Sequence, residues 1–126
     1  MKLRLRENSI RLRLLQTEVR QLREGGNVSE QIIFGVNPTD TLTYSLRISG
    51  EAEKIYAQMI DNKIEIFLPV KIAEIWADTN EIGLYETQNI GDLGELKITV
   101  EKDFVCVDRP MDEDNKDAFP HPKLKC

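Results

Sequence analysis

The sequence predicts an α+β domain built from two pseudo-symmetric ββαββ units, with mostly antiparallel sheet and two short helices around a shared core. Alternating apolar and polar residues mark most of the strands, and two short segments have a helical pattern. The arrangement also recurs at an offset of 54 residues, so that Ile10 lies over Ile64 and Leu46 over Val100. Because the match is one of pattern and not of identity, it predicts an internal duplication and leaves the chemistry open.

The first unit begins with strictly alternating residues, which predict a hairpin with a tight turn at Asn8-Ser9. Thr17 is expected to cap a short helix with Val19 and Leu22 on its inner side. The elements expected in this unit are strands over residues 2–7 and 10–14, a helix over 17–24, and strands over 28–34 and 41–49.

The second unit repeats this order, with its hairpin turn expected at Asp61-Asn62. Pro69 suits the first position of a helix, and Ile72, Ile75 and Trp76 are expected to form its buried stripe. The elements expected here are strands over residues 54–60 and 63–68, a helix over 69–77, and strands over 82–86 and 95–101, with a further strand or extension over 104–107.

A chain of 126 residues and 14.5 kDa predicts one domain with one main core. Each of the two units has only about 50 residues and would be marginally stable alone, so we expect the units to share this core. We expect a duplicated domain over residues 1–107, with units at 1–49 and 55–103. Residues 108–126 are acidic and rich in proline, which predicts an extended or disordered tail with Phe119 as a candidate anchor.

Composition indicates the compartment in which the protein occurs and the kind of surface that it carries. No run approaches a membrane span, the opening residues are not a secretory signal, and two cysteines without such a signal predict reduced thiols in the cytoplasm. The net charge of −5 is unevenly distributed, because residues 1–25 carry seven cations against three acids. A basic end on an acidic chain marks a candidate binding surface.

The first hairpin is the candidate site. A turn at Asn8-Ser9 would place Arg6 opposite Arg11 and Arg4 opposite Arg13, with Lys2 beside them. Like charges in facing positions destabilise a sheet, so this arrangement predicts a neutralising anion. The ordinary alternative is a solvated face whose arginines pair with nearby acids.

Three anions fit these guanidinium groups equally well: the acidic tail of the chain, the carboxylates of an acidic partner protein, and a small phosphate-bearing ligand. The equivalent positions in the second unit are not basic, so the fold does not itself demand arginine there. They are Gln58, Ile60, Glu65 and Phe67. Nucleic acid is a poor candidate, because the rest of the chain is acidic and no aromatic residue alternates with the arginines.

Two other groups of residues are candidates for a site or a contact. Cys106, His121 and Cys126 are a weak alternative for a zinc site, because their spacing matches no common zinc motif, and we expect neither a metal nor a cofactor. The second hairpin carries an apolar outer face of Tyr56, Ile60 and Phe67. This face would pack against the other unit or form a homodimer contact.

The opening MKLRLRENSIRLRLLQTEV and the segment EKDFVCVDRP (residues 101–110) resemble a family of short, single-domain bacterial proteins of unknown function. In that family the pattern at the start is MKxRxRxNSIRxRL, and EKDFxC lies near the C-terminus. The resemblance covers nearly the whole chain and implies no activity.

The sequence therefore favours a non-catalytic binding or interaction module that uses the hairpin arginines. The alternative is a small enzyme acting on a phosphorylated or carboxylated substrate, with the arginines as anchors. Histidine is scarce, so the catalytic groups of such an enzyme would be carboxylates or Cys106.

Overall fold

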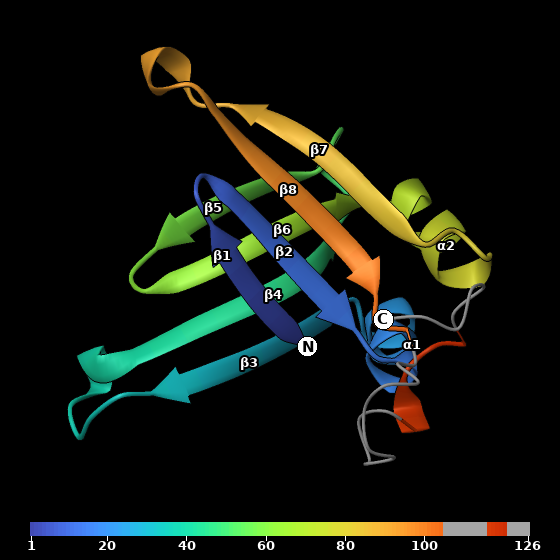
Figure 1. Ribbon diagram of the computed structural model, residues 1–126, viewed down its shortest axis with the longest axis horizontal. Coiled ribbons are helices and arrows are strands. Elements are labelled where there is room, and N and C mark those ends of the chain that lie inside the picture. The colour runs from blue at the N-terminus through green and yellow to red at the C-terminus, as the bar shows by residue number, and fades with distance from the viewer. Residues whose placement is uncertain (105–115, 121–126) are drawn as a thin grey trace.

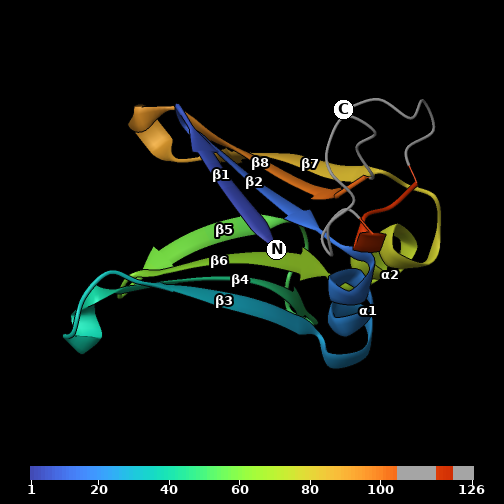
Figure 2. The same cartoon turned by 60° about the horizontal axis from the view of Figure 1, so that its bottom comes forward.

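Two four-stranded sheets pack face to face, and two helices close one end of the space between them (Figures 1 and 2). The structure is a computed structural model that describes residues 1–104 and 116–120. The strands are β1 (Lys2–Arg6), β2 (Ser9–Leu14), β3 (Asn27–Ile33), β4 (Thr41–Ser49), β5 (Tyr56–Ile60), β6 (Lys63–Pro69), β7 (Gly83–Asn89) and β8 (Glu95–Lys102). The helices are α1 (Gln16–Gly25), α2 (Val70–Asp78) and the short 3₁₀ turns η1 (Pro38–Asp40) and η2 (Gly91–Leu93).

Each sheet takes one hairpin from each half of the chain. Sheet A has the order β1-β2-β8-β7 and sheet B the order β3-β4-β6-β5. Neighbours within a hairpin are antiparallel, whereas the central pairs β2/β8 and β4/β6 are parallel. The predicted fold class is confirmed, and the two halves interlock because their strands meet at the centre of both sheets.

The strand pairing repeats along the chain. Lys2 faces Arg13 in the first hairpin, and Tyr56 faces Phe67 at the same positions 54 residues later. Exchanging β1–β4 for β5–β8 converts the order of one sheet into that of the other. The pattern is consistent with the internal duplication predicted from the sequence.

The first hairpin turns one residue earlier than predicted. Arg6 faces Ser9, so the turn is Glu7-Asn8, with Glu7 in the left-handed region at a φ of 53°. The Ser9 hydroxyl donates to the Arg6 carbonyl at 2.6 Å, and the Asn8 side chain donates to the Glu95 carbonyl of β8 at 2.6 Å. The predicted register of Arg6 with Arg11 and Arg4 with Arg13 is therefore wrong by two positions, although the face on which each side chain lies is unchanged.

The helix boundaries also differ from those predicted. Leu15, not Thr17, precedes α1, because the Glu18 carboxylate accepts a hydrogen bond from the Leu15 backbone N–H at 2.8 Å. Pro69 is the residue before α2 and not its first residue. Trp76 is buried as predicted, but Ile75 is 53% exposed. Neither α1 nor α2 is long and apolar enough to cross a membrane, and the described part of the chain has no other candidate.

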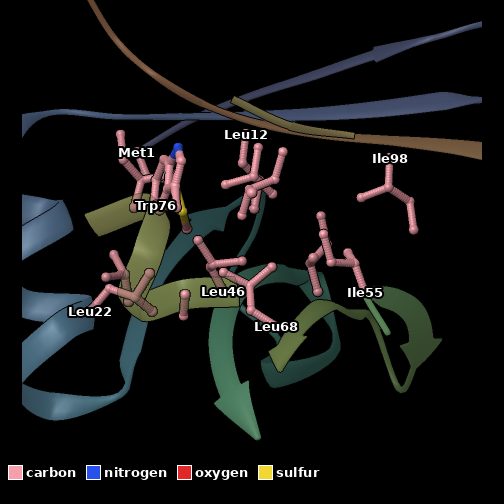
Figure 3. Packing of buried hydrophobic residues seen from close by; sticks show 14 of the residues in the cluster. Met1, Leu12, Leu22, Leu46, Ile55, Leu68, Trp76 and Ile98 are labelled. Atoms are coloured by element: carbon pink, nitrogen blue, oxygen red, sulfur yellow. The ribbon is translucent and has the colours of Figure 1, made fainter. Parts of the chain in front are cut away.

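The core fills the space between the sheets and reaches the helices (Figure 3). Alternation turns one face of each strand toward the space between the sheets, and there Leu12 of sheet A and Leu46 of sheet B are both buried. Trp76 is fully buried beside them, and its indole N–H donates to the Ile82 carbonyl at 3.1 Å. Both halves thus contribute to one hydrophobic core, as a pair of small units requires.

A short segment near the C-terminus packs against this core. The Phe119 N–H donates to the Asp103 carbonyl at 2.7 Å, and its ring meets Phe104 edge to face at 6.0 Å. The Thr17 hydroxyl donates to Asp117 at 2.6 Å. Phe119 is an anchor, as the sequence suggested.

Candidate anion-binding face

The outer face of β1 and β2 carries five cations because alternation turns the leucines and the isoleucine of these strands to the opposite face. On that opposite face Leu3, Ile10, Leu12 and Leu14 pack in the core, whereas Leu5 at the end of β1 is 59% exposed. We call this set the arginine face; it consists of Lys2, Arg4, Arg6, Arg11 and Arg13. Four of the five side chains are exposed, and Arg11 is half-buried.

The register brings four of these cations together. Arg4 lies directly opposite Arg11, and Lys2 lies opposite Arg13. Facing side chains in such a pair have Cβ atoms about 5 Å apart. These four residues line a concavity of about 150 Å³. Arg6 faces Ser9 and does not line the concavity.

Two of the four cations have carboxylate partners near the end of β8. Arg11 Nε lies 3.1 Å from Glu101 Oε1, and Lys2 Nζ lies 2.9 Å from Asp103 Oδ2. Neither Arg4 nor Arg13 forms an ion pair with any residue that the structure describes. The concavity therefore holds two cations without a counter-ion from the described chain.

Sequence reasoning missed the residues that β8 and β7 add to this face. In the row across sheet A that contains Arg4 and Arg11, Thr99 and Tyr85 come next. Tyr85 is 66% exposed, so an aromatic ring does share the face with the arginines. Lys97 pairs with Ser9 and extends the basic area. The parallel pairing of β2 with β8 joins residues far apart in sequence, and no local pattern indicates it.

The equivalent positions on sheet B serve as an internal comparison. Tyr56 and Phe67 replace Lys2 and Arg13, and their rings stack with centroids 4.7 Å apart. Where the first hairpin has Arg4 opposite Arg11, the second has Gln58 opposite Glu65, with an amide–carboxylate contact of 3.4 Å. The positions that repel on sheet A attract on sheet B.

The apolar face predicted for the second hairpin lies on the outside of sheet B. Tyr56 and Phe67 cover each other, whereas Ile60 at the end of β5 is 55% exposed. Alternation turns all three side chains away from the core, so this apolar face does not pack against the other sheet.

A second cavity of about 260 Å³ adjoins the arginine face and is lined by Met1, Lys2, Arg13, Leu15, Glu18 and Glu30. The Met1 amino group donates to Glu18 and, at 2.8 Å, to Glu30. The Tyr44 hydroxyl lies 2.6 Å from the other oxygen of Glu30.

Burial alone would raise the pKa of Glu30, but hydrogen bonds from the Met1 amino group and Tyr44 outweigh it and leave the pKa lowered. Burial, reinforced by the contact with Glu30, raises the pKa of Tyr44. Glu30 is thus an ionised, hydrogen-bonded carboxylate at neutral pH and not a proton donor.

No cluster of metal-ligating side chains occurs within residues 1–104 and 116–120. The weak zinc alternative of Cys106, His121 and Cys126 lies outside these described residues. Of the strand or extension expected over residues 104–107, only Phe104 is described, and it forms an isolated β-bridge with Phe119.

These features define a small two-sheet α+β protein whose principal candidate site is a cationic sheet face. The chain belongs to a family of unknown function, DUF7009, which matches residues 1–123. No curated protein and no solved structure matches the chain.

Proposed function

We propose that the protein is a non-catalytic binding module that holds an anionic group in the concavity of Lys2, Arg4, Arg11 and Arg13. The observation that carries the proposal is the placement of Arg4 opposite Arg11, where Glu101 is the only carboxylate of the described residues paired to either. An anion seated between the two guanidinium groups would convert mutual repulsion into two charge-assisted contacts.

The size of the concavity favours a small charged group. A space of about 150 Å³ suits a phosphate or a carboxylate and excludes a bulky ligand body. The ligand is therefore either a small phosphate-bearing molecule or an acidic side chain, which a partner protein or the acidic tail of the chain would supply. Guanidinium groups bind both, and phosphate offers more acceptor oxygens to converging donors.

The enzyme alternative also has an observation in its favour, because the adjoining cavity shares Lys2 and Arg13 and contains two carboxylates. Both carboxylates, however, accept hydrogen bonds from the Met1 amino group, and Glu30 has a lowered pKa. A general acid or base needs a pKa near the working pH, so Glu30 suits a structural role better. Glu18 is held by the Met1 amino group and by the Leu15 backbone N–H.

A bacterial, cytoplasmic setting belongs to the same proposal. It rests on the resemblance of the opening MKLRLRENSIRLRL and of EKDFVC to short bacterial proteins, together with two cysteines that suit a reducing compartment.

Titration calorimetry of the full chain tests the proposal and separates the ligand classes. Inorganic phosphate and a short poly-glutamate peptide serve as the two probes. Binding of either probe that is lost in an Arg4→Gln, Arg13→Gln variant supports the site, and the stronger probe identifies the class. The matched control is Arg20→Gln, Lys71→Gln, which removes the same charge from exposed positions elsewhere. No binding of either probe, or equal loss in both variants, would count against the proposal.

A further inference from the structure

Strand β3 forms one edge of sheet B, and its free side carries backbone groups that the described chain leaves without a strand partner. The Phe34 N–H donates to the Asp40 carbonyl at 2.7 Å, and the Ile48 N–H donates to the Gly26 carbonyl at 2.9 Å. In an antiparallel pair, only alternate residues direct their N–H and C=O at the partner. The two hydrogen bonds of Phe34 and Gly26 point toward the β4 side, so the even-numbered positions face β4. Ser29, Gln31 and Ile33 consequently direct their N–H and C=O groups outward.

The same edge ends in an exposed apolar segment. All residues from 31 to 39 are exposed and none is charged. Ile33 is 71% exposed, Phe34 is 73% exposed and Val36 is 99% exposed. The one charge on β3, Glu30, is held by the Met1 amino group and Tyr44.

Protein sheets usually protect such edges with charges, prolines or covering groups, because an open edge pairs with other strands. The other edges of this protein carry such devices. Strand β1 presents Lys2, Arg4 and Arg6 in alternation. On β5, the Gln88 side chain of β7 accepts from the Ala57 N–H at 2.7 Å and donates to the Ala57 carbonyl at 3.0 Å. This clamp ties the β5 and β7 edges together and leaves β3 as the open edge in the part of the chain that the structure describes.

We propose that β3 pairs with β3 of a second copy of this chain, antiparallel across a two-fold axis, so that sheet B continues through both copies. Charge favours the second copy as the occupant. The chain carries a net charge of −5 with 31% charged residues, whereas the 31–39 segment has no charged residue, so it brings no charges of its own together when two copies meet. Two-fold pairing also gives each outward N–H of one strand a C=O of the other, and two-fold dimers are the commonest oligomers.

The dimer does not use the side chains of the concavity, which belong to β1 and β2, although Glu30 of β3 lines the adjoining cavity together with Lys2 and Arg13. Its apolar contacts would come from Ile33 and Phe34, which bury surface in proportion to the area removed from water.

Sedimentation velocity and light scattering of the full chain, over a wide range of protein concentration, test the proposal. The wild type is expected at twice the chain mass of 14.5 kDa. Ile33→Lys places a charge on the edge, and Gln31→Pro removes an outward N–H without breaking a bond to β4. Both variants should remain folded by circular dichroism and sediment as monomers. Should Ile33→Lys fail to fold, Gln31→Pro decides the question.

Ile60→Lys is the matched control, since Ile60 is an exposed isoleucine at the end of edge strand β5 and belongs to the other apolar face. It should leave the dimer intact. A wild type that is monomeric at every concentration overturns the proposal. So does a dimer that survives in both β3 variants, or one that Ile60→Lys disrupts.

Discussion

Arg4 and Arg11 lie directly opposite each other across β1 and β2. Neither side chain can leave the outer face of sheet A without reversing the alternation that buries Leu3 and Leu12 on the other side. Two cations are thus held together by the packing of the core, and only Arg11 has a carboxylate partner in the described chain. Such a pair costs stability unless an anion relieves it.

Arg4→Gln should therefore stabilise the protein when no binding anion is present. The expected gain in the free energy of unfolding is up to about 1 kcal/mol at low ionic strength, because a like-charged cross-strand pair is removed. The gain should shrink as chloride screens the charges. Urea unfolding at several chloride concentrations measures it. Arg20→Gln is the control, and an Arg4→Gln variant less stable than this control would contradict the expectation.

Gln88→Ala should open the β5 edge. The Gln88 amide satisfies both backbone groups of the buried Ala57, so its removal should cost about 1–3 kcal/mol. It should also increase aggregation through the exposed edge. Urea unfolding and light scattering measure the two effects, with Gln21→Ala on the exposed side of α1 as the control. If both variants behave as the wild type, the clamp does not contribute.

Phe119→Ala should destabilise the fold by about 1–3 kcal/mol, because its ring packs on Phe104 and lies 5.5 Å from the Lys102 ammonium group. Thermal and denaturant unfolding provide the measurement. Leu93→Ala, at a side chain 88% exposed, should change stability by no more than about 0.5 kcal/mol. Equal effects of the two substitutions would show that residues 116–120 do not stabilise the domain.

Tyr44→Phe should lower stability at neutral pH by about 1–2 kcal/mol, because Glu30 loses a hydrogen bond to its ionised form. A carboxylate with a lowered folded pKa contributes stability that is complete above the ordinary glutamate pKa of about 4.3. That contribution is lost as the pH falls through the lowered value. The difference in the free energy of unfolding between Tyr44→Phe and the wild type should therefore become smaller as the pH is lowered.

Unfolding across this pH range, with Tyr56→Phe as the matched control, measures the effect of Tyr44→Phe. If Glu30 were not involved, the free energy of unfolding would change with pH in the same way for the wild type and for Tyr44→Phe.

Local patterns were sufficient to predict the eight strands of the four hairpins and both helices. Alternation in β1 and β2 identified the outward arginines without any knowledge of the sheet. The register was predicted less well, because the Asn8 side chain and Ser9 are held by β8, which lies far along the chain. Glu101 and Tyr85 reach the site through the same parallel pairing, so no spacing in the sequence could indicate them.

The open edge of β3 could not be predicted either. The segment QIIFGV reads as an ordinary buried strand and turn until the sheet order shows which side has no neighbour. Which edges are covered depends on contacts such as the Gln88 clamp, and these form only in the folded sandwich.

The central claim is that the arginine face binds an anion and is not merely solvated. Its most direct test is the melting temperature in phosphate against chloride at matched ionic strength. An anion that binds only the native state stabilises it by about 2.7 kcal/mol at a hundred times its dissociation constant. Sulfate and phosphate also stabilise proteins in general, so the difference between variants is the informative quantity. We predict an excess rise in phosphate for the wild type and for Arg20→Gln, Lys71→Gln, and its loss in Arg4→Gln, Arg13→Gln. Equal rises in all three proteins would contradict the claim and leave these arginines as a solvated surface.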